Sequence, residues 1–141
     1  MPYIDTSVLA AYYCPEPLSQ EVQNYLSQQL KPLLSSLTGV ELFSAVARKV
    51  RAGEMEKVDG GRIFAKFQFH VEAQLFIVIS VQNHHWRLAR SWVGLFSAPL
   101  KTLDALHLAI ASAEDSELIT SDKNLYQSAE ILGVNARLLG T

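Results

Sequence analysis

The sequence is poor in cysteine, in charge of either sign and in long apolar runs. Cys14 is the only cysteine among 141 residues, so the chain cannot form an internal disulfide, as is typical of proteins in a reducing compartment. Lysine and arginine number 12 against 14 acidic residues, and the net charge of −2 lacks the general basicity of a nucleic-acid-binding domain. A nucleic-acid partner would therefore have to be held by local basic patches or by a metal.

Membrane and export signals are also missing from this sequence. The N-terminus runs directly into Tyr3-Ile4-Asp5 without a cationic and apolar leader, so we expect no signal peptide. The longest apolar run, Leu75 to Ile79, is too short to span a bilayer. These features predict a cytoplasmic protein without a membrane partner.

The chain contains enough apolar material for one ordinary core, since 49% of its residues are hydrophobic and 18% are charged. We expect residues 1–141 to form a single domain. Apolar segments alternate with segments of helical periodicity, which favours an α/β three-layer sandwich around a central, mostly parallel sheet of about five strands. The expected strands are residues 1–4, 33–35, 75–81, 117–120 and 134–139. The expected helices are residues 6–13, 18–30, 38–53, 55–73, 81–96, 103–111 and 125–132.

Three local features sharpen this expectation. Thr38 and Glu41 have the spacing of a capping box at the start of their helix. The pair Gly60-Gly61 is expected to interrupt the helix over residues 55–73. The dense β-branched run over residues 75–81 is typical of a strand covered on both faces.

Four acidic residues occupy related positions in this pattern. Asp104 lies in the first turn of an almost wholly apolar helix, where a buried carboxylate must be paired, neutralised or bound to a metal. Asp5 and Asp122 each follow a strand, and Glu41 lies near the start of a helix. In a parallel α/β sheet these places share one edge, where ligands bind. Each acid alone can equally serve as a helix cap or complement a helix dipole.

Together the four carboxylates predict a metal site. Close carboxylates repel one another, and a divalent cation removes that conflict. Oxygen ligands suit Mg²⁺ or Mn²⁺, which can activate a water for attack on a phosphodiester. Hydroxyl groups beside the acids can support them by hydrogen bonding, or can simply cap helices; these are Thr6, Ser7, Thr120 and Ser121.

Basic and histidine side chains add weaker signals. Arg48, Lys49, Arg51 and Lys123 can contact an RNA backbone, although exposed cations are usually only solvated. His107 shares a helix face with Asp104 and can accept a proton, but a packed core histidine is the favoured interpretation. His84 and His85 are not expected to form a zinc site, because adjacent residues diverge around a helix.

Four segments, in this order, resemble the PIN domain family, in particular the VapC toxins of bacterial and archaeal VapBC toxin–antitoxin pairs. They are Tyr3-Ile4-Asp5-Thr6-Ser7-Val8-Leu9, Ser36-Leu37-Thr38-Gly39-Val40-Glu41-Leu42, Leu103-Asp104-Ala105-Leu106-His107-Leu108-Ala109 and Leu118-Ile119-Thr120-Ser121-Asp122. The resemblance implies a parallel sheet and an endoribonuclease that depends on Mg²⁺ or Mn²⁺. Its acidic site would be Asp5, Glu41, Asp104 and Asp122, supported by Thr120 and Ser7.

The resemblance also implies a homodimer and an antitoxin partner. The antitoxin would cover the active site and occupy a groove between the helices near residues 18–30 and 55–73. Many relatives carry a further acid shortly after the last aspartate, whereas this chain has Lys123 and Asn124. The number of metal ions is therefore left open.

Other functions remain compatible with parts of the pattern. A dehalogenase-type phosphatase needs a second aspartate two residues after the first, where this chain has Ser7, and a receiver domain needs a neighbouring acidic pair that Asp5 lacks. A non-catalytic scaffold of the same fold and a free-standing RNA-maturation nuclease also remain as alternatives.

Overall fold

The computed structural model of the protein describes residues 1–29 and 31–140 and has one five-stranded sheet. The strands are β1 (Pro2–Ile4), β2 (Leu33–Ser35), β3 (Ile77–Ile79), β4 (Glu117–Thr120) and β5 (Ala136–Leu138). They lie in the order β3-β2-β1-β4-β5, and every neighbouring pair is parallel. The predicted α/β fold with a parallel sheet is therefore confirmed.

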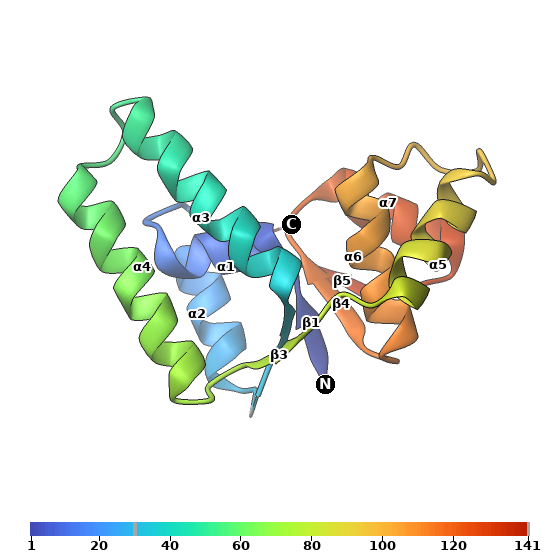
Figure 1. Cartoon of the computed structure of the whole chain (residues 1–141), viewed down its shortest axis with the longest axis horizontal. Coiled ribbons are helices and arrows are strands. Elements are labelled where there is room, and N and C mark those ends of the chain that lie inside the picture. The colour runs from blue at the N-terminus through green and yellow to red at the C-terminus, as the bar shows by residue number, and fades with distance from the viewer. Residues whose placement is uncertain (30, 141) are drawn as a thin grey trace.

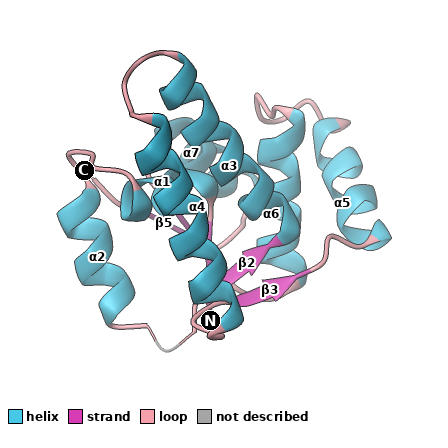
Figure 2. Ribbon diagram, turned by 60° about the vertical axis from the view of Figure 1, so that its left-hand side comes forward, coloured by secondary structure: helices cyan, strands magenta, loops and turns pink. Residues whose placement is uncertain are grey.

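Helices cover the sheet on both sides (Figure 1). The first group is α1 (Thr6–Tyr13), α2 (Ser19–Ser27), α3 (Ser36–Arg51) and α4 (Lys57–Glu72); the second is α5 (Asn83–Val93), α6 (Thr102–Ala113) and α7 (Lys123–Leu132). Each group packs its apolar side chains into its own hydrophobic cluster. Figure 2 shows α5 and α6 on the opposite side of the strands from α2 and α4.

The central strands supply side chains to both clusters because successive residues of a strand face opposite sides. The first residue of each pair contacts the α5–α7 cluster and the second contacts the α1–α4 cluster: Tyr3 and Ile4, Leu33 and Leu34, Leu118 and Ile119. All six are buried. These strands therefore fix the position of the loops that follow them.

The helix start predicted at Thr38 is wrong by one turn. Ser35 is the N-cap of α3, and Thr38 is the third helical residue, whose hydroxyl accepts a hydrogen bond from the Ser35 N–H at 3.3 Å. Glu41 is therefore in the second turn, not in a capping box with Thr38. Because β2 runs directly into α3, no loop separates strand from helix.

Two further expectations are also wrong. The run over residues 75–81 contributes only three residues to β3, and β3 is an edge strand whose Val78 is 44% exposed. Helix α4 continues through Gly60 and Gly61 without a break. Leu30, which we expected to end the second helix, lies outside the described residues.

The glycine pair of α4 gives a matched prediction. A Cβ on Gly60 would lie 3.1 Å from Val50 Cγ2, whereas a Cβ on Gly61 would meet nothing within 4 Å. Gly61→Ala should therefore stabilise the protein by about 0.5–1 kcal/mol, since alanine favours a helix interior more than glycine does. Gly60→Ala should gain less, because Val50 must move. Urea denaturation of both variants checks this, and equal gains would contradict it.

In residues 1–29 and 31–140, none of the helices combines the length and apolarity that a bilayer crossing requires.

Candidate active site

Asp5 is the N-cap of α1 and is only 3% exposed. Its Oδ1 accepts hydrogen bonds from the Val8 N–H at 3.1 Å and the Ser7 hydroxyl at 2.6 Å. Its Oδ2 accepts one from the Thr120 hydroxyl at 2.6 Å. The predicted capping role is therefore real, and the same carboxylate also joins the C-terminal end of β1 to that of β4.

The charge on Asp5 is costly in this position. Burial raises the pKa of Asp5 above its ordinary value, although hydrogen bonds from Ser7 and Thr120 and the proximity of His107 act in the opposite direction. A cation beside Asp5 would stabilise the ionised form of this buried carboxylate.

Asp122 lies at the end of β4 and is the N-cap of α7. Its Oδ1 accepts hydrogen bonds from the Asn124 N–H at 2.9 Å and the Leu125 N–H at 3.3 Å. Its own N–H donates to Thr120 Oγ1 at 3.0 Å. Thr120 therefore connects Asp5 to Asp122. The two hydrogen bonds of the cap use Oδ1 of Asp122. Within residues 1–29 and 31–140, no group donates a hydrogen bond to its Oδ2.

Asp104 lies in the first turn of α6, as predicted. Burial raises the pKa of Asp104, and repulsion from Asp122 and Glu41 raises it further, while His107 and Lys101 act against this. Within the described ranges no residue donates a hydrogen bond to its carboxylate. The repulsion identifies Asp104, Asp122 and Glu41 as one electrostatic group.

Glu41 completes this group from α3. Its Oε1 accepts hydrogen bonds from the Thr6 hydroxyl at 2.7 Å and from His107 Nε2–H at 2.5 Å. Partial burial would raise the pKa of Glu41, but the His107 and Thr6 interactions outweigh burial and lower it. Glu41 therefore remains ionised, with both of these bonds on one oxygen.

Two residues beside the acids, His107 and Tyr3, have contacts that the sequence did not predict. His107 is buried, as favoured, but it also contacts Glu41. Tyr3 bonds to the other ring nitrogen of His107, with 2.7 Å between Oη and Nδ1. The three-residue spacing from Asp104 pointed to His107, whereas a tyrosine in a buried strand carried no signal for this role.

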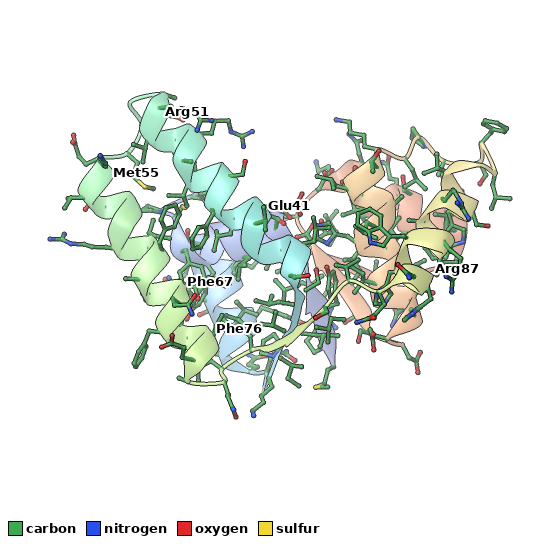
Figure 3. All side chains as sticks on the ribbon, in the orientation of Figure 1. Glu41, Arg51, Met55, Phe67, Phe76 and Arg87 are labelled. Atoms are coloured by element: carbon green, nitrogen blue, oxygen red, sulfur yellow. The ribbon has the colours of Figure 1, made fainter. Side chains whose placement is uncertain are left out.

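The predicted RNA-contacting cations divide into two places. Lys123 is exposed and follows Asp122 directly. Arg48, Lys49 and Arg51 lie in the last turns of α3, about 10–15 Å along its axis from Glu41. Figure 3 shows Arg51 at the far end of α3 from Glu41. Lys49 also pairs with Glu16 at 3.7 Å. Of these four cations, the structure places Lys123 beside the acids and the other three further along α3.

The acidic group suits a hard divalent cation. It offers oxygen ligands, its repulsion is relieved by positive charge, and its hydrogen bonds leave one oxygen each on Glu41 and Asp122. Among the described residues, no three of the four acids bring oxygens within 4.8 Å of one another. This spacing leaves room for an ion that keeps several of its waters.

A second group of ligand-type side chains lies at the opposite end of α6. Ligand atoms of His84, His85 and Glu114 lie within 4.8 Å of one another, so the expected divergence of the two histidines is wrong. His85 Nδ1 accepts the Gln82 N–H at 2.9 Å, so the neutral ring carries its proton on Nε2, 3.4 Å from Glu114 Oε1. A protonated nitrogen cannot bind a metal. This group is therefore explained by helix capping beside an acid.

Thr120 provides a test of the hydrogen bonds that hold the acids. Thr120→Val removes the donor to Asp5 and the acceptor of the Asp122 N–H, both in a fully buried place. We expect a loss of about 1–3 kcal/mol in the free energy of unfolding, measured in urea, because buried polar groups lose their partners. Thr120→Ser keeps the hydroxyl and is the control. Equal stability of the Val and Ser variants would contradict this role.

Comparison with known proteins identifies chains that are similar to this one. A family model described as PIN domain matches residues 3–131. Ribonuclease VapC46 of Mycobacterium tuberculosis is 29% identical over 135 residues, covering 94% of this chain and 92% of the relative.

Solved structures show the same fold at lower identity. The sarcin-ricin-loop-cleaving toxin VapC20 of M. tuberculosis superposes with a TM-score of 0.74 at 14% identity, covering 91% of this chain and 95% of that one. VapBC2 of Rickettsia felis, solved bound to a fragment of promoter DNA, gives a TM-score of 0.70 at 14% identity, covering 99% and 100%. The two structures agree with the architecture described above.

Proposed function

Because the chain belongs to the PIN domain family, we propose that it is a divalent-metal-dependent endoribonuclease, the toxin of a toxin–antitoxin pair. The observation that carries the proposal is the gathering of Asp5, Glu41, Asp104 and Asp122 at one edge of the sheet. The name of the ribonuclease relative, which covers 94% of this chain, supports the same activity. We take residues 1–141 as one nuclease domain.

The acids would hold Mg²⁺ or Mn²⁺ through Asp104, Asp122, Glu41 and Asp5. When bound, such an ion supplies positive charge for the phosphodiester and makes a water more acidic. The chain's own contribution is to orient Glu41 and Asp5 and to favour their ionised forms. Thr6, Ser7 and Thr120 do this by donating hydroxyl hydrogen bonds to Glu41 and Asp5.

The RNA would approach the acids along a surface with few cations. Lys123 is exposed beside Asp122 and would contact a phosphate. Arg48 and Arg51 are exposed further along α3 and would contact the backbone at a distance from the cut. With a net charge of −2, the chain would depend on the metal for much of its attraction to RNA.

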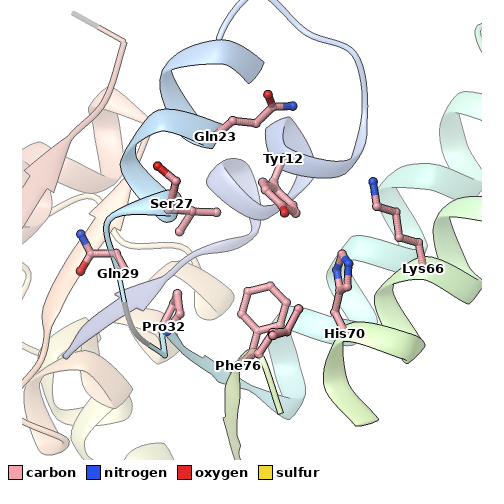
Figure 4. Close-up of a pocket in the computed structure, with 10 residues that line it drawn as sticks. Tyr12, Gln23, Ser27, Gln29, Pro32, Lys66, His70 and Phe76 are labelled. Atoms are coloured by element: carbon pink, nitrogen blue, oxygen red, sulfur yellow. The ribbon is translucent and has the colours of Figure 1, made fainter. Parts of the chain in front are cut away.

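An antitoxin partner is proposed for the groove between α2 and α4. A hollow of about 430 Å³ lies there, lined by residues of both helices. In Figure 4, Gln23 and Ser27 lie on one side of it and Lys66 and His70 on the other, with Tyr12 between them. A helix that lays apolar side chains into such a hollow is a common mode of recognition. None of the four acids lines the hollow, so one partner would have to extend past the hollow to contact both.

We also propose a homodimer and a cytoplasmic location. Exposed apolar side chains gather near the loop between α5 and α6, with Leu95 58% and Phe96 92% exposed. Burying them against a second copy would remove this apolar surface from water. Cytoplasmic RNA is the substrate that a toxin of this kind would meet.

Cleavage of total cellular RNA by the purified protein tests the function. Discrete fragments with Mg²⁺ or Mn²⁺, and none with EDTA, are expected. Absence of both cleavage and a metal-induced rise in Tm would favour the non-catalytic scaffold. Cleavage of a precursor to a mature RNA end, with no antitoxin encoded beside the gene, would favour the RNA-maturation nuclease.

A further inference from the structure

A row of buried hydrogen bonds leads from the core to Glu41. The Ser35 and Tyr3 hydroxyls lie 2.9 Å apart, Tyr3 Oη lies 2.7 Å from His107 Nδ1, and His107 Nε2 lies 2.5 Å from Glu41 Oε1. Ser35, Tyr3 and His107 are each at most 3% exposed. The three residues come from β2, β1 and α6, and Glu41 comes from α3, so the row links the two groups of helices.

The direction of these bonds follows from the groups involved. An ionised carboxylate only accepts, so His107 Nε2 donates to Glu41. In the neutral ring Nδ1 then accepts from the Tyr3 hydroxyl, which in turn accepts from Ser35. Burial raises the pKa of Tyr3 to about 12, so its hydroxyl keeps the proton that it donates. Each group therefore sets the orientation of the next.

His107, at the end of this row, helps to fix one oxygen of the Glu41 carboxylate. His107 and Thr6 both bond to Oε1 from opposite parts of the chain, α6 and α1. Across residues 1–29 and 31–140, no donor bonds to Oε2. A carboxylate fixed through one oxygen presents the other in a constant direction.

We propose that His107 is a positioning residue, which holds Glu41 so that its Oε2 faces the acidic site, and that Tyr3 fixes the ring of His107 for this purpose. The inference rests on the proposed function of the four acids and adds two residues to it. His107 acts through Glu41 and does not itself contact the substrate.

The test compares His107→Leu with His107→Gln, because glutamine carries an N–H donor at the reach of Nε2 and leucine carries none. Calorimetric titration with Mn²⁺ should show affinity about 10–100-fold weaker for the Leu variant and recovered in the Gln variant. The kcat for RNA should fall in parallel with KM unchanged. Tyr3→Phe should show a smaller loss of the same kind.

Two controls keep the result specific. His85→Leu removes the other buried histidine, which lies beside Glu114 at the opposite end of α6 from Asp104, and this variant should bind Mn²⁺ as the wild type does. In a Glu41→Gln background, His107→Leu should weaken Mn²⁺ binding no further, since the two residues act through one contact.

The failure of this inference differs from the failure of the proposed function. A wild-type protein that neither binds Mn²⁺ nor cleaves RNA would overturn the function, and with it the role of His107. A wild type that binds and cleaves, beside a His107→Leu variant with unchanged Mn²⁺ affinity and kcat, would overturn the inference alone. Additive losses in the Glu41→Gln background would also overturn it.

Discussion

Asp104→Asn is expected to lower RNA cleavage by at least about 100-fold, on the scale of losing one electrostatic group that stabilises a transition state. Asp104 is the acid with the least support from the chain: in the described part of the structure its carboxylate accepts no hydrogen bond, and Asp122 and Glu41 repel it. A bound cation would therefore stabilise the charge of Asp104 more than that of the other acids. Initial rates on a defined RNA with saturating Mg²⁺ measure the loss.

The matched control is Asp59→Asn. Asp59 lies in the first turn of α4, as Asp104 does in α6, but it is exposed and pairs with Arg62 at the surface. Its removal should leave the rate within about twofold, because exposed ion pairs contribute little. Unimpaired cleavage by Asp104→Asn would remove this residue from the site, while similar losses in both variants would indicate a general effect of charge.

Binding of Mn²⁺ should stabilise the wild type strongly at neutral pH. At one hundred times its Kd, a ligand specific for the folded state contributes about 2.7 kcal/mol, which corresponds to a rise of roughly 10 °C in Tm for a domain of this length. Asp104→Asn should remove most of this shift. The same variant should melt higher than wild type without metal, because it lacks the repulsion from Asp122.

The pH dependence of this shift has a definite sign. The pKa values of Asp5 and Asp104 are raised in the folded state. Without metal, the stability that these two groups contribute is fully present below the ordinary aspartate pKa of about 4 and is lost as pH rises through their raised values. Glu41, whose pKa is lowered, contributes above its ordinary pKa and loses that contribution as pH falls through its lowered value.

Acidification should therefore shrink the Mn²⁺-induced rise in Tm, starting above the ordinary aspartate pKa, because protons compete for Asp5 and Asp104 first. Thermal melts with and without Mn²⁺ between pH 7 and pH 4.5 measure this. A shift that stays constant over that range would contradict metal binding by these carboxylates.

The order of strands and helices was predictable from periodicity, because most segments are long or are bounded by glycine or proline. Gly133, with φ of 73°, ends α7 as its position predicts, and Pro99 lies in the break before α6. The positions of Asp5, Asp104 and Asp122 were predictable for the same reason, since each lies where an apolar segment begins or ends, whereas Glu41 lies in the second turn of α3. What patterns could not supply was the pairing between distant hydroxyls and carboxylates.

The errors have particular causes. The β3 run is as apolar as a central strand, and only the sheet order reveals that it is an edge. The helix start at α3 was placed late because Ser35 reads as the end of a strand, although it caps the helix as well. His107 has the composition of a core residue and gains its contact to Glu41 only when α6 meets α3.

The central position of β1 affects the order in which the protein becomes active. Thr120 and Asp5 are hydrogen-bonded partners that stand 115 positions apart, and β1 pairs with β4 in the finished sheet. At the rates of translation, on the order of ten seconds separate the synthesis of these residues. A nascent chain that ends before β4 lacks Thr120 and Asp122, so it cannot complete the acidic edge. A ribosome producing this protein is therefore exposed to its ribonuclease only after β4 and Asp122 have been made.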